Sequence, residues 1–210
     1  LPGTPGFDVW DQLLSGFILL KFHEENLEIY LDLASDDNRA NFIDLRAHWD
    51  HTLGYQLGIN KVFNHKRYEI LTGVEFLTTR ISNTLNPKFN RGDPNSHNFY
   101  TKKVYDYFSY KGRRIGAHSG SSSDDLIFLF GLKNKVSTIM ISYNKERHGI
   151  KSMQYPELKR EYSVSYQRNF FKNHKIYLNA EHEKIDNYAF IKNNVSVSNL
   201  FLIGYSLYFN

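Results

Sequence analysis

The sequence predicts an all-β fold, an antiparallel transmembrane β-barrel, from three observations. Hydrophobic and polar residues alternate with a period of two over most of the 210 residues. Short and long connections separate the alternating segments in turn, as in barrels with tight turns at one end and extended loops at the other. Aromatic residues recur near the ends of these segments, where membrane barrels carry their interfacial belts.

The composition agrees with this fold class. Aromatic residues make up 16% of the chain, which argues against disorder. No apolar stretch approaches the roughly 20 residues that a membrane helix needs. The chain contains no cysteine, which excludes disulfides and thiolate zinc sites. Its 26 Lys and Arg residues are interspersed with 22 Asp and Glu residues, so no nucleic-acid partner is predicted.

The predicted strands follow one another along the chain. Residues 13–22 and 126–132 are apolar on both faces and are still interpreted as strands. In residues 27–34, Glu28, Tyr30 and Asp32 alternate with aliphatic residues. The other alternating segments are residues 52–63, 68–79, 138–144, 162–167, 176–183 and 196–209. The total is about nine or ten strands, most of them near the roughly 9–11 residues that cross a membrane when tilted.

The connections and the last strand favour a membrane barrel over a soluble β-barrel or sandwich. Residues 64–67, 133–134 and 172–174 are short connections, and residues 82–98 and 148–157 are long ones. The chain ends in an aromatic strand with Phe209, like the terminus that the barrel assembly machinery recognises. Outer-membrane lipid and that machinery are therefore predicted partners. A soluble β-barrel binding module remains the alternative, because the period of two does not say which face contacts water.

The sequence predicts no enzyme, no cofactor and no metal site. His48 and His51 are three residues apart, which places them on opposite faces of a strand. His118 lies beside Ser119, Ser121, Ser122 and Ser123 and precedes Asp124 and Asp125, but the segment lacks a nucleophile turn. Gly112, Gly116 and Gly120 have no strand-turn-helix context for a phosphate loop.

Several blocks of the chain, in order, resemble the Wzi-type capsule-assembly family of outer-membrane proteins. The first is residues 27–37, a strand that runs into the acidic pair Asp36-Asp37. The second is residues 51–61, which is similar to the family's Tyr-x-x-Gly-x-x-Lys strand. A strand with Glu at residues 68–79 follows, and then the aromatic and glycine-rich residues 105–123. The match depends on the order and spacing of these blocks.

This resemblance implies both an architecture and a function. Residues 1–210 would be the C-terminal portion of an outer-membrane barrel, about half of one with about 18 strands. The resemblance implies that the N-terminal helical plug and the earlier strands of the family would lie outside these residues. The implied function is to bind and organise capsular polysaccharide at the surface of a Gram-negative bacterium, without covalent chemistry.

The candidate polysaccharide-binding residues are aromatic and charged residues of the predicted loops. Aromatic rings stack on sugar faces, and an arginine fork suits a sugar carboxylate. The candidates are Tyr100, Tyr105, Tyr107, Phe108, Tyr110, Arg113, Glu146, Arg147 and His148. The same aromatic residues also suit an interfacial belt, and the charged ones a solvated rim. The alternative function is an outer-membrane porin or solute channel, in which the polar faces line a pore.

Overall fold

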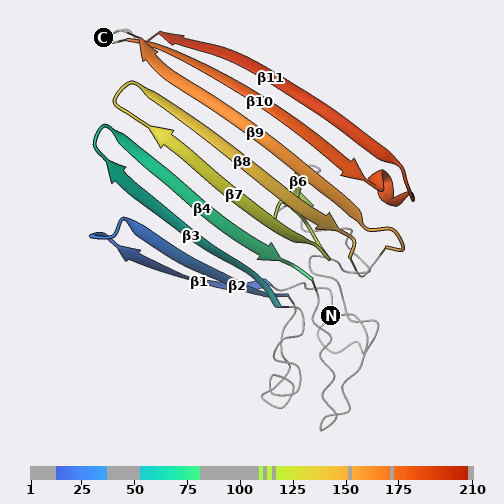
Figure 1. The fold of residues 1–210 in the computed structure, drawn as a ribbon. Coiled ribbons are helices and arrows are strands. Elements are labelled where there is room, and N and C mark those ends of the chain that lie inside the picture. Colours follow the sequence, from blue (N-terminus) through green and yellow to red (C-terminus); the bar gives the residue numbers. More distant parts are fainter. Residues whose placement is uncertain are drawn as a thin grey trace.

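The computed structural model describes residues 13–36, 53–80, 109–110, 113–114, 117–150, 153–170 and 173–207. Nine of its strands form one antiparallel sheet, so the all-β prediction is confirmed (Figure 1). Two short strands, β5 (Ser109–Tyr110) and β6 (Arg113–Arg114), pair separately. The helical element of the described residues is the 3-10 turn η2 (Tyr188–Phe190). No helix in this part of the chain is long and apolar enough to cross a membrane.

The sheet is a meander in which each strand pairs with the next large strand along the chain. Its order is β1-β2-β3-β4-β7-β8-β9-β10-β11. The bounds are β1 (Leu13–Phe22), β2 (Leu27–Asp36), β3 (Leu53–His65), β4 (Tyr68–Thr78), β7 (Asp124–Lys133), β8 (Ser137–His148), β9 (Glu157–Phe170), β10 (His174–Asp186) and β11 (Val195–Leu207). Strands at both doubly apolar segments, residues 13–22 and 126–132, are thereby confirmed.

The two ends of the sheet differ in the connections that they carry. Residues 23–26, 66–67, 134–136 and 171–173 link strands at one end, the short-turn end. Residues 37–52, 79–123, 149–156 and 187–194 link strands at the other, the long-connection end. The two ends are separated along the strands in Figure 1. The predicted alternation of short and long connections is therefore confirmed.

The sheet has an apolar face and a polar face. One continuous row of paired residues on the apolar face contains Ile59, Val74, Phe128, Tyr143 and Tyr162. The next row along, on the polar face, runs from Gly58 to Glu75, Ile127, Asn144 and Glu161. Because side chains alternate between faces along each strand, the antiparallel register keeps the two sets apart over the whole sheet.

The sheet is open and has little buried core of its own. Its edges are β1 and β11, and these two strands do not pair with each other. In the part of the chain that the structure describes, Leu77 is the only buried large hydrophobic residue. Phe17 on β1 and Ile203 on β11 are 78% and 80% exposed. The apolar face therefore has no second protein layer over it within the described residues.

Two tyrosines pack flat across neighbouring strands on the polar face. Tyr30 lies opposite Gly58, and Tyr177 lies opposite Gly204. A methyl group at either glycine would overlap the tyrosine ring. Tyr30 then reaches past β3 and donates a hydrogen bond to Glu75 on β4. Each ring thus uses the space that a glycine leaves free on the next strand.

Candidate functional site

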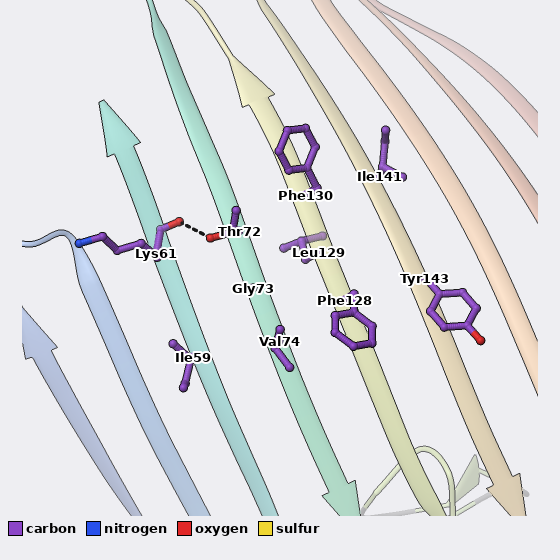
Figure 2. Close-up of a pocket in the computed structure, with 10 residues that line it drawn as sticks. All are labelled: Ile59, Lys61, Thr72, Gly73, Val74, Phe128, Leu129, Phe130, Ile141 and Tyr143. Atoms are coloured by element: carbon purple, nitrogen blue, oxygen red, sulfur yellow. Dashed lines mark hydrogen bonds between the residues drawn. The ribbon is translucent and has the colours of Figure 1, made fainter. Parts of the chain in front are cut away.

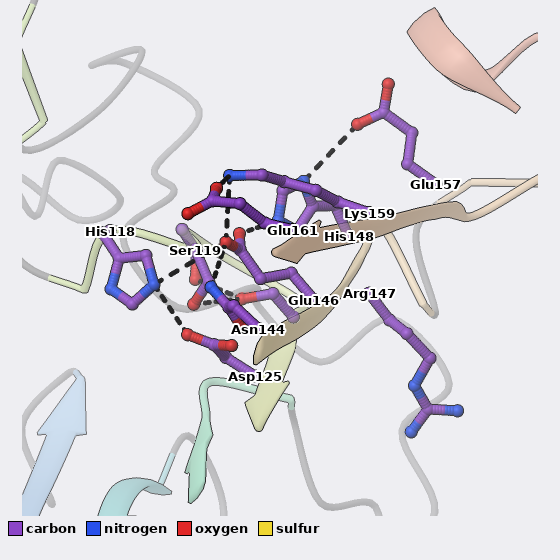
Figure 3. Close-up of polar contacts among 12 residues, drawn as sticks. His118, Ser119, Asp125, Asn144, Glu146, Arg147, His148, Glu157, Lys159 and Glu161 are labelled. Carbon is purple, nitrogen blue, oxygen red and sulfur yellow. Dashed lines mark hydrogen bonds and ion pairs between the residues drawn. The ribbon is translucent and has the colours of Figure 1, made fainter. Parts of the chain in front are cut away.

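A group of charged and polar side chains gathers on the polar face at the long-connection end. This polar cluster comprises His118, Asp125, Asn144, Glu146, His148, Glu157, Lys159, Glu161 and Glu183. Figure 3 shows most of these side chains converging from β7, β8, β9 and the segment before β7. Asp125 and Glu146 are buried, although both are carboxylates.

Strand register brings the cluster together. Asp125 on β7 lies opposite Glu146 on β8, and Glu146 lies opposite Lys159 on β9. Asn144 and His148 flank Glu146 at alternate positions of β8, so all three project from the same face. The centre of the cluster is therefore built by three neighbouring strands in regular pairing, which holds these members firmly in place, and Glu183 on β10 and His118 before β7 complete it.

Hydrogen bonds among Thr79, Gly120 and Ser123 place His118 over these strands. The amide of Gly120 donates to Ala117 O at 3.0 Å, which closes a turn through His118, and Gly120 has a φ of 81°. The Ser123 hydroxyl donates to Gly120 O at 2.8 Å. The Thr79 amide, at the end of β4, donates to Ser123 O at 2.9 Å. These bonds fix the turn against the end of β4 and so hold His118 in position.

His118 and Asp125 form a close pair. His118 Nε2 lies 2.6 Å from Asp125 Oδ2 and 3.9 Å from Glu146 Oε1. The imidazole is half exposed, whereas the Asp125 carboxyl is almost completely buried. The close contact with the Asp125 carboxylate raises the pKa of His118, and partial burial opposes this effect. The imidazole thus faces solvent on one side and a buried carboxylate on the other.

Glu146 is the most connected member of the cluster. Its Oε2 lies 2.8 Å from His148 Nε2. Its Oε1 accepts a hydrogen bond from Asn144 Nδ2 at 2.8 Å and lies 3.2 Å from Lys159 Nζ. Lys159 Nζ also lies 3.0 Å from Glu161 and 3.3 Å from Glu183. The Lys159 ammonium group therefore forms ion pairs with three carboxylates.

Three oxygen atoms of the cluster are buried and accept no hydrogen bond from the described residues. They are Asp125 Oδ1, Asp125 Oδ2 and Asn144 Oδ1. Asp125 Oδ2 contacts the imidazole of His118 as an ion pair. Buried polar atoms are nearly always paired, so these oxygens mark a place where a donor or a cation fits.

The structure separates the charged residues that were predicted to bind polysaccharide. Glu146 and His148 belong to the polar cluster, but Arg147 projects to the apolar face and away from the cluster in Figure 3. Its guanidinium donates two hydrogen bonds to Asp124, one of them from Nε to Oδ1 at 2.7 Å. The fork expected to hold a sugar carboxylate is therefore occupied by a carboxylate of the protein.

The other predicted site residues lie beyond what the structure describes in detail. Tyr110 and Arg113 are in β5 and β6, whose side chains are outside the description. Tyr100, Tyr105, Tyr107 and Phe108 are outside the described residues, as are His48 and His51. Their proposed roles stay predictions.

Sequence reasoning missed Asn144, Lys159 and Glu161 as site residues. The available signal was polar alternation, because Asn144-Glu146-His148 and Glu157-Lys159-Glu161 each repeat at every second position. Such ladders share a face of a sheet when two strands pair.

Comparison of the chain with protein-family models, curated proteins and solved structures gives no match.

Proposed function

We propose that the chain forms part of the wall of an outer-membrane β-barrel that binds and organises capsular polysaccharide at the surface of a Gram-negative bacterium, without covalent chemistry. The observation that carries the membrane part is the uncovered apolar face of the sheet. Leu57, Ile141 and Val164 lie in its middle and are 44–46% exposed. Soluble monomers rarely expose contiguous apolar patches larger than a few hundred Å². Lipid is the solvent that suits such a face.

An aromatic row supports a membrane boundary near the long-connection end. Phe128, Tyr143, Tyr162 and His182 follow one another across β7, β8, β9 and β10 on the apolar face. Their ring centroids are 6.4, 5.0 and 6.4 Å apart in that order. Amphipathic rings favour the interface between hydrocarbon and water.

Charged side chains follow that aromatic row on the side toward the long-connection end. Lys145, Arg160 and Lys184 form the next row of the apolar face. Arg160 lies 3.0 Å from Asp186, which also pairs with Lys184. The change from rings to ion pairs within two residues of each strand is the pattern expected where a strand leaves the hydrocarbon.

The height of the apolar band also fits a bilayer. Tyr162 and Phe170 are eight residues apart on the same face of β9. This is roughly 27 Å of strand, which a tilt of 35–45° reduces to about 19–22 Å, close to the roughly 25 Å apolar band of membrane barrels. Lys61, also on the apolar face, extends its ammonium to the carbonyl of Glu25 in a short turn, as a snorkelling lysine does.

The apolar face carries a shallow groove that suits an acyl chain. Its volume is about 480 Å³, and Figure 2 shows it over β3, β4, β7 and β8. Gly73 and Thr72 lie between larger side chains of the neighbouring strands, among them Ile59, Phe128 and Phe130. In the proposed orientation this groove faces lipid, and further strands pair with β1 and β11, because open sheet edges are not tolerated in hydrocarbon.

The polysaccharide part of the proposal rests on the family resemblance and on the place of the polar cluster. The long connections and the cluster share one end of the sheet, which in outer-membrane barrels is the extracellular end. Asn, Glu, Lys and His side chains there offer donors and acceptors for sugar hydroxyls.

Site-directed spin labels test the membrane part. Labels at Leu57, Ile141 and Val164 should be accessible to oxygen dissolved in the lipid, and labels at Gln56, Ser165 and Asn179 should not. Each set lies on one face of the sheet, and Leu57 with Gln56 on β3 and Val164 with Ser165 on β9 are pairs matched by strand. Equal lipid accessibility of the two sets would refute the orientation.

Capsule retention tests the polysaccharide part. A deletion strain should release more capsule into the medium than the parent while synthesising a similar total amount. Complementation with Tyr107→Ala should restore retention only in part. Tyr68→Ala, at the short-turn end, is the matched control and should restore it fully. Normal retention in the deletion strain would contradict a role in holding capsule.

A second candidate function, a solute channel, is favoured by the extent of the polar face. Gln56, Glu75, Ser142 and Glu181 extend the polar groups of this face beyond the polar cluster, on β3, β4, β8 and β10. Planar-bilayer recordings distinguish this function. A channel should give discrete conductance steps whose cation preference falls in Glu181→Gln, whereas a closed polysaccharide-binding barrel should give none.

A further inference from the structure

We propose that His118, Asp125 and Glu146 bind a divalent transition-metal ion of the zinc class at the long-connection end of the polar face. One ligand atom of each side chain lies within 4.8 Å of the other two. The three residues come from the turn before β7, from β7 and from β8, and Figure 3 shows them facing one another.

The distances suit a shared ion. His118 Nε2 lies 2.6 Å from Asp125 Oδ2 and 3.9 Å from Glu146 Oε1. Nitrogen and oxygen ligands bind zinc at about 2.0–2.2 Å, so two ligands of one ion lie roughly 3–4 Å apart. The 3.9 Å separation fits this range, whereas the contact of His118 with Asp125 would open by roughly 0.5–1 Å to admit an ion. The regular strand pairing keeps the two carboxylates in place.

An independent observation points to a missing ligand for the oxygens. Asp125 is only 2% exposed, and its Oδ1 has no hydrogen-bond partner within the described part of the chain. Asn144 Oδ1 is buried and unpartnered in the same way, and its amide adjoins Glu146. A buried carboxylate is strongly disfavoured unless it is paired or coordinates a metal. An ion at the trio would supply that interaction, with Asn144 Oδ1 as a candidate fourth ligand.

The charge of the polar cluster also favours a cation. Lys159 pairs with Glu146, Glu161 and Glu183, three carboxylates for one ammonium group. Asp125 adds a further negative charge and pairs only with the half-exposed imidazole of His118 among the described residues. Net negative charge in a partly buried site binds cations more strongly than the same charge in water.

The ligand chemistry narrows the choice of ion. Calcium and magnesium take oxygen ligands almost exclusively, whereas imidazole with carboxylates suits zinc and its neighbours. His118 has one exposed side, which gives the ion a path from solvent. The hydrogen bonds among Thr79, Gly120 and Ser123 hold the turn that carries the imidazole in position, so metal binding requires little ordering of the chain.

Metal titration of the full chain tests the proposal. The folded protein is freed of metal with a chelator in detergent micelles and titrated with Zn²⁺ by calorimetry, with Co²⁺ absorbance as a second readout. The wild type should bind one ion per chain. His118→Gln and Asp125→Asn should each weaken binding by more than about 100-fold, because loss of an outer-shell partner alone typically weakens it 10- to 100-fold.

His65→Gln is the matched control, since His65 is exposed at the short-turn end and should bind as the wild type does. Folded mobility on gels establishes that each variant is intact, and the half-exposed His118 carries the test if Asp125→Asn does not fold. No stoichiometric binding by the wild type would overturn the proposal. Binding that His118→Gln leaves unchanged would overturn it equally, since the ion would then lie elsewhere.

Discussion

Gly58 shows how the absence of a side chain determines packing on the polar face. The ring of Tyr30 occupies the space beside its Cα and continues to Glu75, so three strands are tied by one tyrosine. Gly204 and Tyr177 repeat the arrangement between β10 and β11. Glycine is needed at these positions for close approach and not for an unusual backbone angle.

We therefore expect Gly58→Ala to lower the free energy of unfolding by about 1–3 kcal/mol, the usual range for overpacking. The added methyl group overlaps the Tyr30 ring, which must leave Glu75. Gly16→Ala is the control, because nothing lies within 4 Å of a methyl group there. Urea titration of both variants in micelles measures the effect, and equal unfolding free energies would contradict the packing argument.

The residues of the polar cluster were only partly predictable from sequence. Glu146 and His148 were named as candidates, and Asp125 was considered only as a hydrolase residue type. Their grouping with His118 depends on the register between β7 and β8 and on the turn at Gly120. Neither can be read from one sequence, because a shift of one residue in pairing would move Asp125 to the other face.

At the scale of elements, the connection between β10 and β11 is tightly built. Asn187, Ala189 and Phe190 have φ values of 57–59°, in the left-handed region. The Ala189 amide donates to Glu157 Oε1 at 2.7 Å, and Asn187 Nδ2 donates to Pro156 O at 3.0 Å. The connection is thus bonded to the one between β8 and β9, which keeps the backbone in this conformation.

Replacement of Ala189 by glycine should stabilise the protein. A left-handed alanine costs roughly 1–2 kcal/mol, and the larger entropy of glycine in the unfolded chain offsets about 0.4–1 kcal/mol, so a net gain near 0.5–1 kcal/mol is expected. Ala180→Gly, in the extended part of β10, should destabilise by about 0.5–1 kcal/mol. Thermal unfolding of both variants measures the signs, and a loss of stability in Ala189→Gly would contradict the prediction.

Strand positions were predicted well, and strand lengths less well. Residues 13–22 coincide with β1, but residues 138–144 and 162–167 fall short of β8 and β9. Both strands continue into the charged residues of the long-connection end. Hydrophobic periodicity ends there, since both faces become polar, while the backbone pairing continues.

For the whole molecule, we expect the stability cost of an added charge to differ between the apolar and the polar face. Leu57→Arg or Ile141→Arg should cost about 2–4 kcal/mol near the middle of the membrane, and Gln56→Arg or Ser165→Arg should cost much less. Leu57 and Gln56 are neighbours on β3 and so provide a matched pair. Unfolding of the variants in lipid bilayers measures the difference, and equal costs would argue for a soluble sheet.

The strand order itself has a consequence for folding kinetics. The sheet consists of two meanders, β1–β4 and β7–β11, which pair through β4 and β7 across the 45 residues between Thr78 and Asp124. Closing that loop costs about 1.5 kcal/mol more in chain entropy than closing the eight-residue connection between β8 and β9. Each meander can therefore form by local contacts before the seam closes. Because Thr79, at the end of β4, bonds the turn that carries His118, we expect the polar cluster to be complete only after the seam has closed.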